Sequence, residues 1–186
     1  MEKLKVADMM VPLSEYATVP EDATLFDAVS ALEKAQVEFD HTRYRHRAIL
    51  VLGHDGNVLG KLTQLDALKA LEPKYDAMLD RQRSHHLGFT KEFMRSMLKD
   101  EHLFASPLDD ICRKAGEQNV KKHMHTISDG EYIKEEATLD EAIHQLVLGN
   151  HQSLLVMRQG SITGILRLTD VFAAVYHTMR ECFKDR

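Results

Sequence analysis

Apolar and polar positions follow one order twice along this 186-residue chain. In the first copy, an apolar helical face is made of Leu25, Ala28, Val29 and Leu32. An apolar run over 48–52 follows, then the polar turn 53–57, and then a second apolar run over 58–62. Short apolar runs on either side of such a turn are typical of a β-hairpin. The pattern therefore predicts an amphipathic helix followed by two paired strands.

The same order returns in the second half of the chain. Residues 6–32 align without a gap with residues 120–146, at an offset of 114. The offset then falls to 104, so that 60–66 (GKLTQLD) matches 164–170 (GILRLTD). The first copy carries extra residues around 39–47. Self-similarity at this spacing indicates two copies of one supersecondary unit.

Each copy is predicted to run strand, helix, strand, strand, helix. A short extended segment contains Val19 or Ile133. Thr24 or Thr138 then stands where an N-cap belongs, at the start of the first helix. One unit of roughly 55 residues has a marginal core by itself. Two copies can bury their apolar faces against each other about a pseudo-two-fold axis.

The predicted fold class is α/β (α+β), with two tandem repeats packed about that axis and a helical insert between them. The repeats span 1–72 and 120–186, and the insert spans 73–119. Pro73 ends the helix before it. Within 91–104, apolar residues recur at helical spacing as Phe93, Met94, Met97 and Leu98. This stripe is expected to pack either on its own module or on a second chain.

A second helix of the insert is predicted after residue 105. Ser106 is the expected N-cap, Pro107 the first helical residue, and Gly116 the end of the helix.

Composition narrows the classes of function. The net charge of −5 does not favour nucleic acid or an anionic membrane as a partner. Cys112 and Cys182 lack metal-ligand spacing and are too few for a disulfide framework, which favours a reducing compartment. The N-terminus has no apolar run of signal-peptide length, and no segment has the roughly 18 apolar residues of a membrane helix. We therefore expect a cytoplasmic protein.

The repeated unit resembles the CBS domain, pairs of which form the Bateman module. The local signature of that family is a glycine, a Thr or Ser two or three residues later, and an Asp three further along. The first copy fits it with Gly60, Thr63 and Asp66. The second copy has Gly164 and Asp170, but Arg167 stands where Thr or Ser is usual.

The resemblance implies a cleft at the repeat interface that binds an adenine nucleotide or derivative, such as AMP, ADP, ATP or S-adenosylmethionine. It implies that Asp66 and Asp170 accept hydrogen bonds from ribose hydroxyls and that Thr63 faces phosphate. A carboxylate can accept from two vicinal hydroxyls with charge-assisted strength. The alternative is that both aspartates only cap their helices.

Arg167 predicts a difference between the two motif sites. Its guanidinium can bind phosphate oxygens in bidentate fashion. Alternatively, it lies across its own site and pairs with Asp170 at spacing i,i+3. We favour the phosphate role, because an exposed Arg–Asp pair gains little and is easily exchanged for a ligand contact.

Two further clusters of residues have candidate chemistry. The basic run 41–47 (HTRYRHR) can supply arginines to a phosphate, but a solvated loop is favoured. His123 and His125 would lie on one side of a strand, a spacing that can begin a metal site. No Cys or carboxylate near them in sequence completes such a site, so no metal is predicted.

The chain has no nucleophile elbow, P-loop or HExxH motif, and we predict that it is not an enzyme. The predicted function is a regulatory, ligand-sensing module in signal transduction, in which a bound nucleotide favours one arrangement of the repeats and a protein partner reads it. The alternative is a ligand-free interaction or dimerisation scaffold. A homodimer is expected from the apolar residues of the second helices, Leu68, Leu71, Phe172, Val175 and Met179.

Overall fold

The computed structural model describes residues 4–37, 46–83 and 90–184. The first repeat consists of β2 (Thr18–Pro20), α1 (Leu25–Val37), β3 (Ala48–Leu52), β4 (Val58–Thr63) and α2 (Gln64–Lys69). The second consists of β6 (Tyr132–Lys134), α6 (Leu139–Gly149), β7 (Ser153–Arg158), β8 (Ser161–Arg167) and α7 (Leu168–Lys184). The predicted order of elements and the fold class are confirmed.

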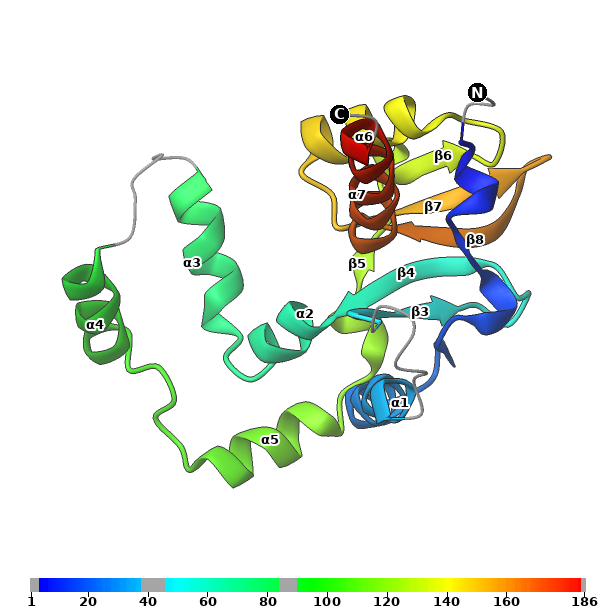
Figure 1. Ribbon diagram of the computed structural model, residues 1–186. Helices are drawn as coiled ribbons and strands as arrows, with labels where there is room; N and C mark the ends of the chain where they lie inside the picture. Colours follow the sequence, from blue (N-terminus) through cyan, green and yellow to red (C-terminus); the bar gives the residue numbers. More distant parts are fainter. Residues whose placement is uncertain (1–3, 38–45, 84–89, 185–186) are drawn as a thin grey trace.

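The two repeats also exchange one short strand each. The strand β1 (Val11–Pro12), near the start of the first repeat, pairs with β8 of the second. The strand β5 (His125–Thr126), near the start of the second repeat, pairs with β4 of the first. The sheet orders are therefore β1-β8-β7-β6 and β2-β3-β4-β5. Figure 1 shows the two sheets one above the other, with the N-terminal segment running from the upper to the lower.

A glycine in each repeat makes room for the incoming strand. A Cβ atom on Gly60 would lie 2.6 Å from the carbonyl oxygen of His125, and one on Gly164 would lie 2.5 Å from that of Val11. Both distances are shorter than a carbon and a backbone oxygen tolerate. The glycine of the repeated motif is therefore required by close approach of a neighbouring backbone.

The helices α1 and α6 begin where the sequence predicts. The Asp27 N–H donates to the Thr24 hydroxyl at 3.1 Å, and the Thr138 N–H donates to the Glu141 carboxylate at 2.7 Å. Both predicted N-caps are confirmed, and each forms one side of a local Thr–carboxylate pair.

The core has one apolar cluster centred on each repeat, completed by residues of the neighbouring segments, and a third between the two sheets. The first surrounds Ala28 and Leu62, and the second surrounds Ala142 and Leu166. The third joins the two sheets and contains Val11, Tyr16, Leu50, Leu155 and Ile165. This last cluster provides the reason for duplication, because a single unit would leave it open to water.

The insert forms an arm that arcs away from the two sheets (Figure 1). It contains α3 (Lys74–Arg83), α4 (Lys91–Asp100) and α5 (Leu108–Gly116). The helical insert is confirmed, but α4 stops at Asp100 rather than continuing to residue 104, and two residues that follow it, His102 and Phe104, have positive φ. The apolar stripe of α4 has no fully buried residue.

The start of α5 corrects the predicted cap. Pro107 is the N-cap, and the first helical residue is Leu108. Pro107 has a ψ of 141°, which is extended, so it cannot be the first helical residue and the helix begins one position later than predicted. Gly116 is the last helical residue, as predicted.

Within the described ranges no helix is both long and apolar enough to cross a membrane. Cys112 and Cys182 are both exposed free thiols.

Candidate functional site

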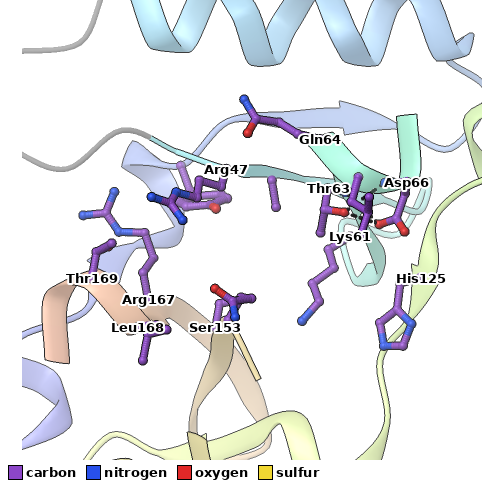
Figure 2. A pocket seen from close by; sticks show the side chains of 14 residues that line it. Arg47, Lys61, Thr63, Gln64, Asp66, His125, Ser153, Arg167, Leu168 and Thr169 are labelled. Carbon is purple, nitrogen blue, oxygen red and sulfur yellow. Dashed lines mark hydrogen bonds between the residues drawn. The ribbon is translucent and has the colours of Figure 1, made fainter. Parts of the chain in front are cut away.

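A cleft of about 420 Å³ lies between the two repeats (Figure 2). Matched positions of both repeats line it: Thr63 corresponds to Arg167 and Gln64 to Leu168. The ends of β4 and β8 and the first turns of α2 and α7 supply these residues. Thr63 and Asp66 of the first motif and Arg167 of the second therefore line one cleft at the repeat interface.

Thr63 and Asp66 form a capping pair at one end of the cleft. The Thr63 N–H and hydroxyl donate to one Asp66 carboxylate oxygen at 3.0 and 2.6 Å, and the Asp66 N–H donates back to the hydroxyl at 3.1 Å. The other oxygen of Asp66 lies 3.5 Å from the Lys69 ammonium. Both residues line the cleft. The capping alternative is thus present in the structure, and one Asp66 oxygen remains outside the capping pair.

Arg167 and Asp170 form a tighter pair at the matched place. Two nitrogens of the guanidinium donate to the two carboxylate oxygens, at 2.7 and 2.6 Å, and the Arg167 N–H adds a third contact at 3.2 Å. Arg167 is only 7% exposed and still lines the cleft, whereas Asp170 is not among the lining residues. This is the i,i+3 pairing that the sequence offered as an alternative to phosphate binding.

The wall of the cleft also has apolar parts. Tyr16, Ala48, Leu65 and Leu168 belong to its lining. Burial raises the pKa of the Tyr16 hydroxyl well above its usual value, so the side chain is neutral. A cleft lined by apolar side chains together with a few polar groups is suited to an aromatic base that carries a sugar phosphate.

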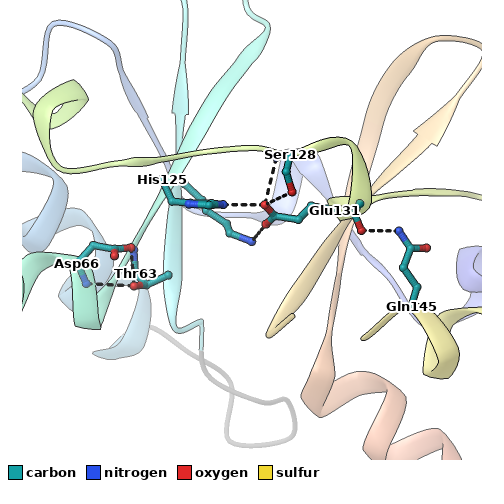
Figure 3. Close-up of polar contacts among 8 residues, drawn as sticks. Thr63, Asp66, His125, Ser128, Glu131 and Gln145 are labelled. Atoms are coloured by element: carbon teal, nitrogen blue, oxygen red, sulfur yellow. Dashed lines mark hydrogen bonds and ion pairs between the residues drawn. The ribbon is translucent and has the colours of Figure 1, made fainter. Parts of the chain in front are cut away.

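A buried carboxylate links the two repeats behind the cleft wall. Glu131 lies just before β6 and is 2% exposed. It accepts hydrogen bonds from the Lys61 ammonium and from His125 Nε2, the latter at 2.7 Å (Figure 3). The N–H and hydroxyl of Ser128 donate to it at 3.2 and 3.0 Å. Lys61 and His125 themselves line the cleft.

The charge state of Glu131 follows from these contacts. Burial by itself raises the pKa of a carboxyl group, but the hydrogen bonds from Lys61, His125 and the Ser128 backbone outweigh it and lower the pKa of Glu131 to about 2. Glu131 is therefore an anion at neutral pH and forms an ion pair with Lys61.

Sequence reasoning missed this network, although a signal for it was present. In the aligned copies, Lys61 stands opposite Ile165 and His125 stands opposite Val11. Glu131 stands opposite Ala17. A polar residue where the other copy has an apolar one marks a position whose environment differs between the copies.

The remaining candidates lie elsewhere. His123 precedes β5 instead of sharing a strand with His125, and its ring nitrogen contacts the Gln118 amide oxygen at 3.2 Å. The described residues contain no group of three or more His, Cys, Asp or Glu that could hold a metal ion. Residues 41–45 of the basic run lie outside the described residues, whereas Arg47 is exposed and lines the cleft.

These features define the class of protein: a tandem-repeat module with a ligand-sized cleft at the interface of its repeats. The model of the CBS domain family matches residues 6–73 and 122–177, and the chain belongs to that family. A comparison with curated protein sequences gives no match.

Solved structures with this fold are similar over almost their whole length. CBSX2 in complex with AMP is 16% identical and covers 95% of this chain and 98% of its own, with a TM-score of 0.58. AcuB from Vibrio cholerae is 19% identical and covers 99% and 98%, with a TM-score of 0.59. The CBS domain of a bacterial CNNM/CorC family Mg²⁺ transporter in complex with ATP is 14% identical and covers 91% and 84%, with a TM-score of 0.55.

Proposed function

We propose that this chain is a regulatory module that binds an adenine nucleotide in the cleft between its repeats and signals the bound state to a protein partner. The observation that carries the proposal is the cleft itself, lined by the matched motif residues of both repeats. Proteins of this family are typically regulatory rather than catalytic. Two structures that share the fold contain AMP and ATP, which supports a ligand of this class. A cytoplasmic location is part of the proposal and rests on composition.

In the proposed complex, Asp66 receives the ribose. The carboxylate oxygen of Asp66 outside the capping pair accepts a ribose hydroxyl, while its partner oxygen keeps the Thr63 contacts. The Thr63 hydroxyl donates to Asp66, so it donates to a phosphate only after that hydrogen bond breaks. At the other end, Asp170 remains with Arg167, and a nucleotide there must open that pair first.

The first test is thermal unfolding with AMP, ADP, ATP and S-adenosylmethionine. A ligand that binds only the folded state adds about 2.7 kcal/mol at one hundred times its Kd. We expect at least one of the four to raise the unfolding temperature. The absence of any shift at millimolar concentration would refute nucleotide sensing and favour a ligand-free scaffold.

The second test is Asp66→Ala in a calorimetric titration. Loss of a charge-assisted hydrogen bond should weaken nucleotide binding by about 1.5–3 kcal/mol. Asp27→Ala is the matched control, because Asp27 makes the same three contacts with Thr24 on α1 and is not among the cleft residues. Equal affinity in the two variants would rule out the ribose role.

The third test is Arg167→Thr, which restores the residue usual at this position of the motif. If Arg167 closes its end of the cleft, the variant should gain a second binding event. If Arg167 binds phosphate, the variant should lose its preference for di- or triphosphate over monophosphate. Unchanged stoichiometry and preference would show that this end takes no part in binding.

A homodimer is part of the proposal, and exposed apolar residues on α7 support it. Phe172 is 67% exposed, and Tyr176, Met179 and Phe183 continue the same helical stripe in exposed positions. Leu68 is exposed as expected, but Leu71 packs against the core of the first repeat. The same stripe would serve the alternative of an interaction scaffold. Light scattering should give twice the chain mass at micromolar concentration, and a strict monomer would refute the dimer.

A further inference from the structure

At the Thr63 end of the cleft, the Lys61 ammonium is paired with the Glu131 carboxylate, which also accepts hydrogen bonds from other groups. Among the described residues, Glu131 is the hydrogen-bond partner of the Lys61 ammonium. That carboxylate also accepts from His125 and twice from Ser128. An ammonium has three N–H donors. Lys61 is 8% exposed, and its ammonium lies on the cleft wall near Ser153 and His125 (Figure 2).

At the other end of the cleft, the charge of Arg167 is neutralised by Asp170. Asp170 accepts three hydrogen bonds from Arg167, in bidentate geometry and at close range. This pair is a small neutral unit in which the guanidinium fork is used on the carboxylate. A phosphate that bound Arg167 would have to displace Asp170, whereas a phosphate that bound Lys61 could use the remaining N–H donors and leave Glu131 in place.

The neighbours of Lys61 also favour an anion. His125 lines the cleft on the strand beside Lys61, because Lys61 and His125 are partners in the β4–β5 ladder. Asp66 is the single carboxylate among the described lining residues; one of its oxygens accepts from Thr63, and the other lies 3.5 Å from the Lys69 ammonium. A ligand at this end therefore meets the remaining N–H donors of the Lys61 ammonium, and the one carboxylate beside it already has a hydroxyl and an ammonium as partners.

We infer that Lys61, held beside His125 by the buried Glu131, forms a phosphate-binding subsite at the Thr63 end of the cleft. The inference deepens the proposed function and rests on it for the nucleotide. Lys61 then has the phosphate-binding role that the sequence suggested for Arg167. Glu131 touches no ligand and acts only through the two side chains that it holds.

The test compares AMP with adenosine, which differ by the phosphate. Calorimetric titrations are made with the parent protein, with Lys61→Met/Glu131→Gln, and with the control Lys121→Met/Glu21→Gln. The control removes another Lys–Glu pair, which joins the same two parts of the sequence at 2.5 Å but does not line the cleft. The AMP-to-adenosine affinity ratio should fall about tenfold or more in the first variant, as for loss of a charged hydrogen bond, and should not change in the control.

The single variant Glu131→Gln separates the subsite from a merely structural role. It keeps the Lys61 ammonium and an acceptor of similar shape, so the affinity ratio should stay within about threefold of the parent. A ratio that falls as far as in the double variant, or equal losses for AMP and adenosine, would overturn the inference. If the double variant does not fold, Lys61→Ile/His125→Val/Glu131→Ala replaces it, because these are the residues of the other copy.

Inorganic pyrophosphate distinguishes this inference from the proposed function. Thermal stabilisation of the parent by pyrophosphate, lost in Lys61→Met/Glu131→Gln and kept in the control, supports the subsite even if no nucleotide binds. If nucleotides bind but neither the ratio nor the pyrophosphate response depends on Lys61, the proposed function survives and the subsite is refuted. If neither nucleotides nor pyrophosphate bind, both are refuted.

Discussion

The two copies of the repeat place different chemistry on the same backbone. In one sheet, Val11 of β1 is the register partner of Ile165 of β8, and both belong to the apolar cluster between the sheets. In the other sheet, the equivalent register pair is His125 of β5 and Lys61 of β4, which surround the buried Glu131.

The difference shows that the backbone follows the pseudo-two-fold symmetry, whereas the side chains around the cleft do not. A buried ion pair adds little stability over apolar residues of similar size, because desolvation offsets the attraction. The Val11–Ile165 half shows that the fold accommodates the apolar solution. The polar half, Lys61, His125 and Glu131, is thus better explained by the groups that it presents to the cleft than by the stability that it adds to the core.

The largest effect should come from breaking the polar half on one side only. Lys61→Met leaves the Glu131 carboxylate buried without its main counter-charge, and we expect a loss of about 3–5 kcal/mol in the free energy of unfolding. Ile165→Met, the matched change in the apolar half, should cost less than about 1.5 kcal/mol. Urea denaturation measures both. Similar losses would mean that the two halves are energetically alike.

Acid should weaken the polar half next most strongly. The folded pKa of Glu131 is lowered from 4.5 to about 2, so its contribution is fully present above pH 4.5 and is lost as the pH falls towards 2. A shift of this size corresponds to roughly 3 kcal/mol. Denaturation between pH 2 and 6 should show this loss in the parent protein and a correspondingly smaller one in Glu131→Gln. Parallel curves for the two proteins would contradict it.

A smaller loss of stability, equal in the two halves, is expected at the motif glycine that both repeats share. Gly60→Ala and Gly164→Ala each push a Cβ atom against the backbone of an incoming strand. We expect each to cost about 1–3 kcal/mol, the range for overpacking, with a difference between them of less than about 1 kcal/mol. Thermal or urea unfolding checks this. If only one substitution is costly, the two strand exchanges are not equivalent.

The smallest effect should come from making the halves the same. Lys61→Ile/His125→Val/Glu131→Ala copies the apolar half into the polar one. Because well-packed apolar residues commonly replace a buried ion pair without loss, the free energy of unfolding should fall by less than about 1 kcal/mol or should rise. A loss above about 3 kcal/mol in urea denaturation would show that the polar network is needed for folding.

Local rules were sufficient for much of the fold. The repeat, the helix caps at Thr24 and Thr138 and the two hairpins could be predicted, because each depends on residues close together in the chain. The helical insert was also predictable, although the start of α5 moved by one residue. The strand exchange was not, since a two-residue strand such as β1 has no periodicity to detect.

The sequence by itself determined that this protein is a duplicated α/β unit with a motif at each repeat, because periodicity and capping act over a few residues. Only the tertiary structure decided which charged groups meet. It selected the local Arg167–Asp170 pair from the two alternatives that the sequence left open, and it brought Glu131 to Lys61 from 70 residues away in the chain. Partners so distant in the chain are chosen by how the two sheets pack, and the charge and shape of the cleft depend on that packing.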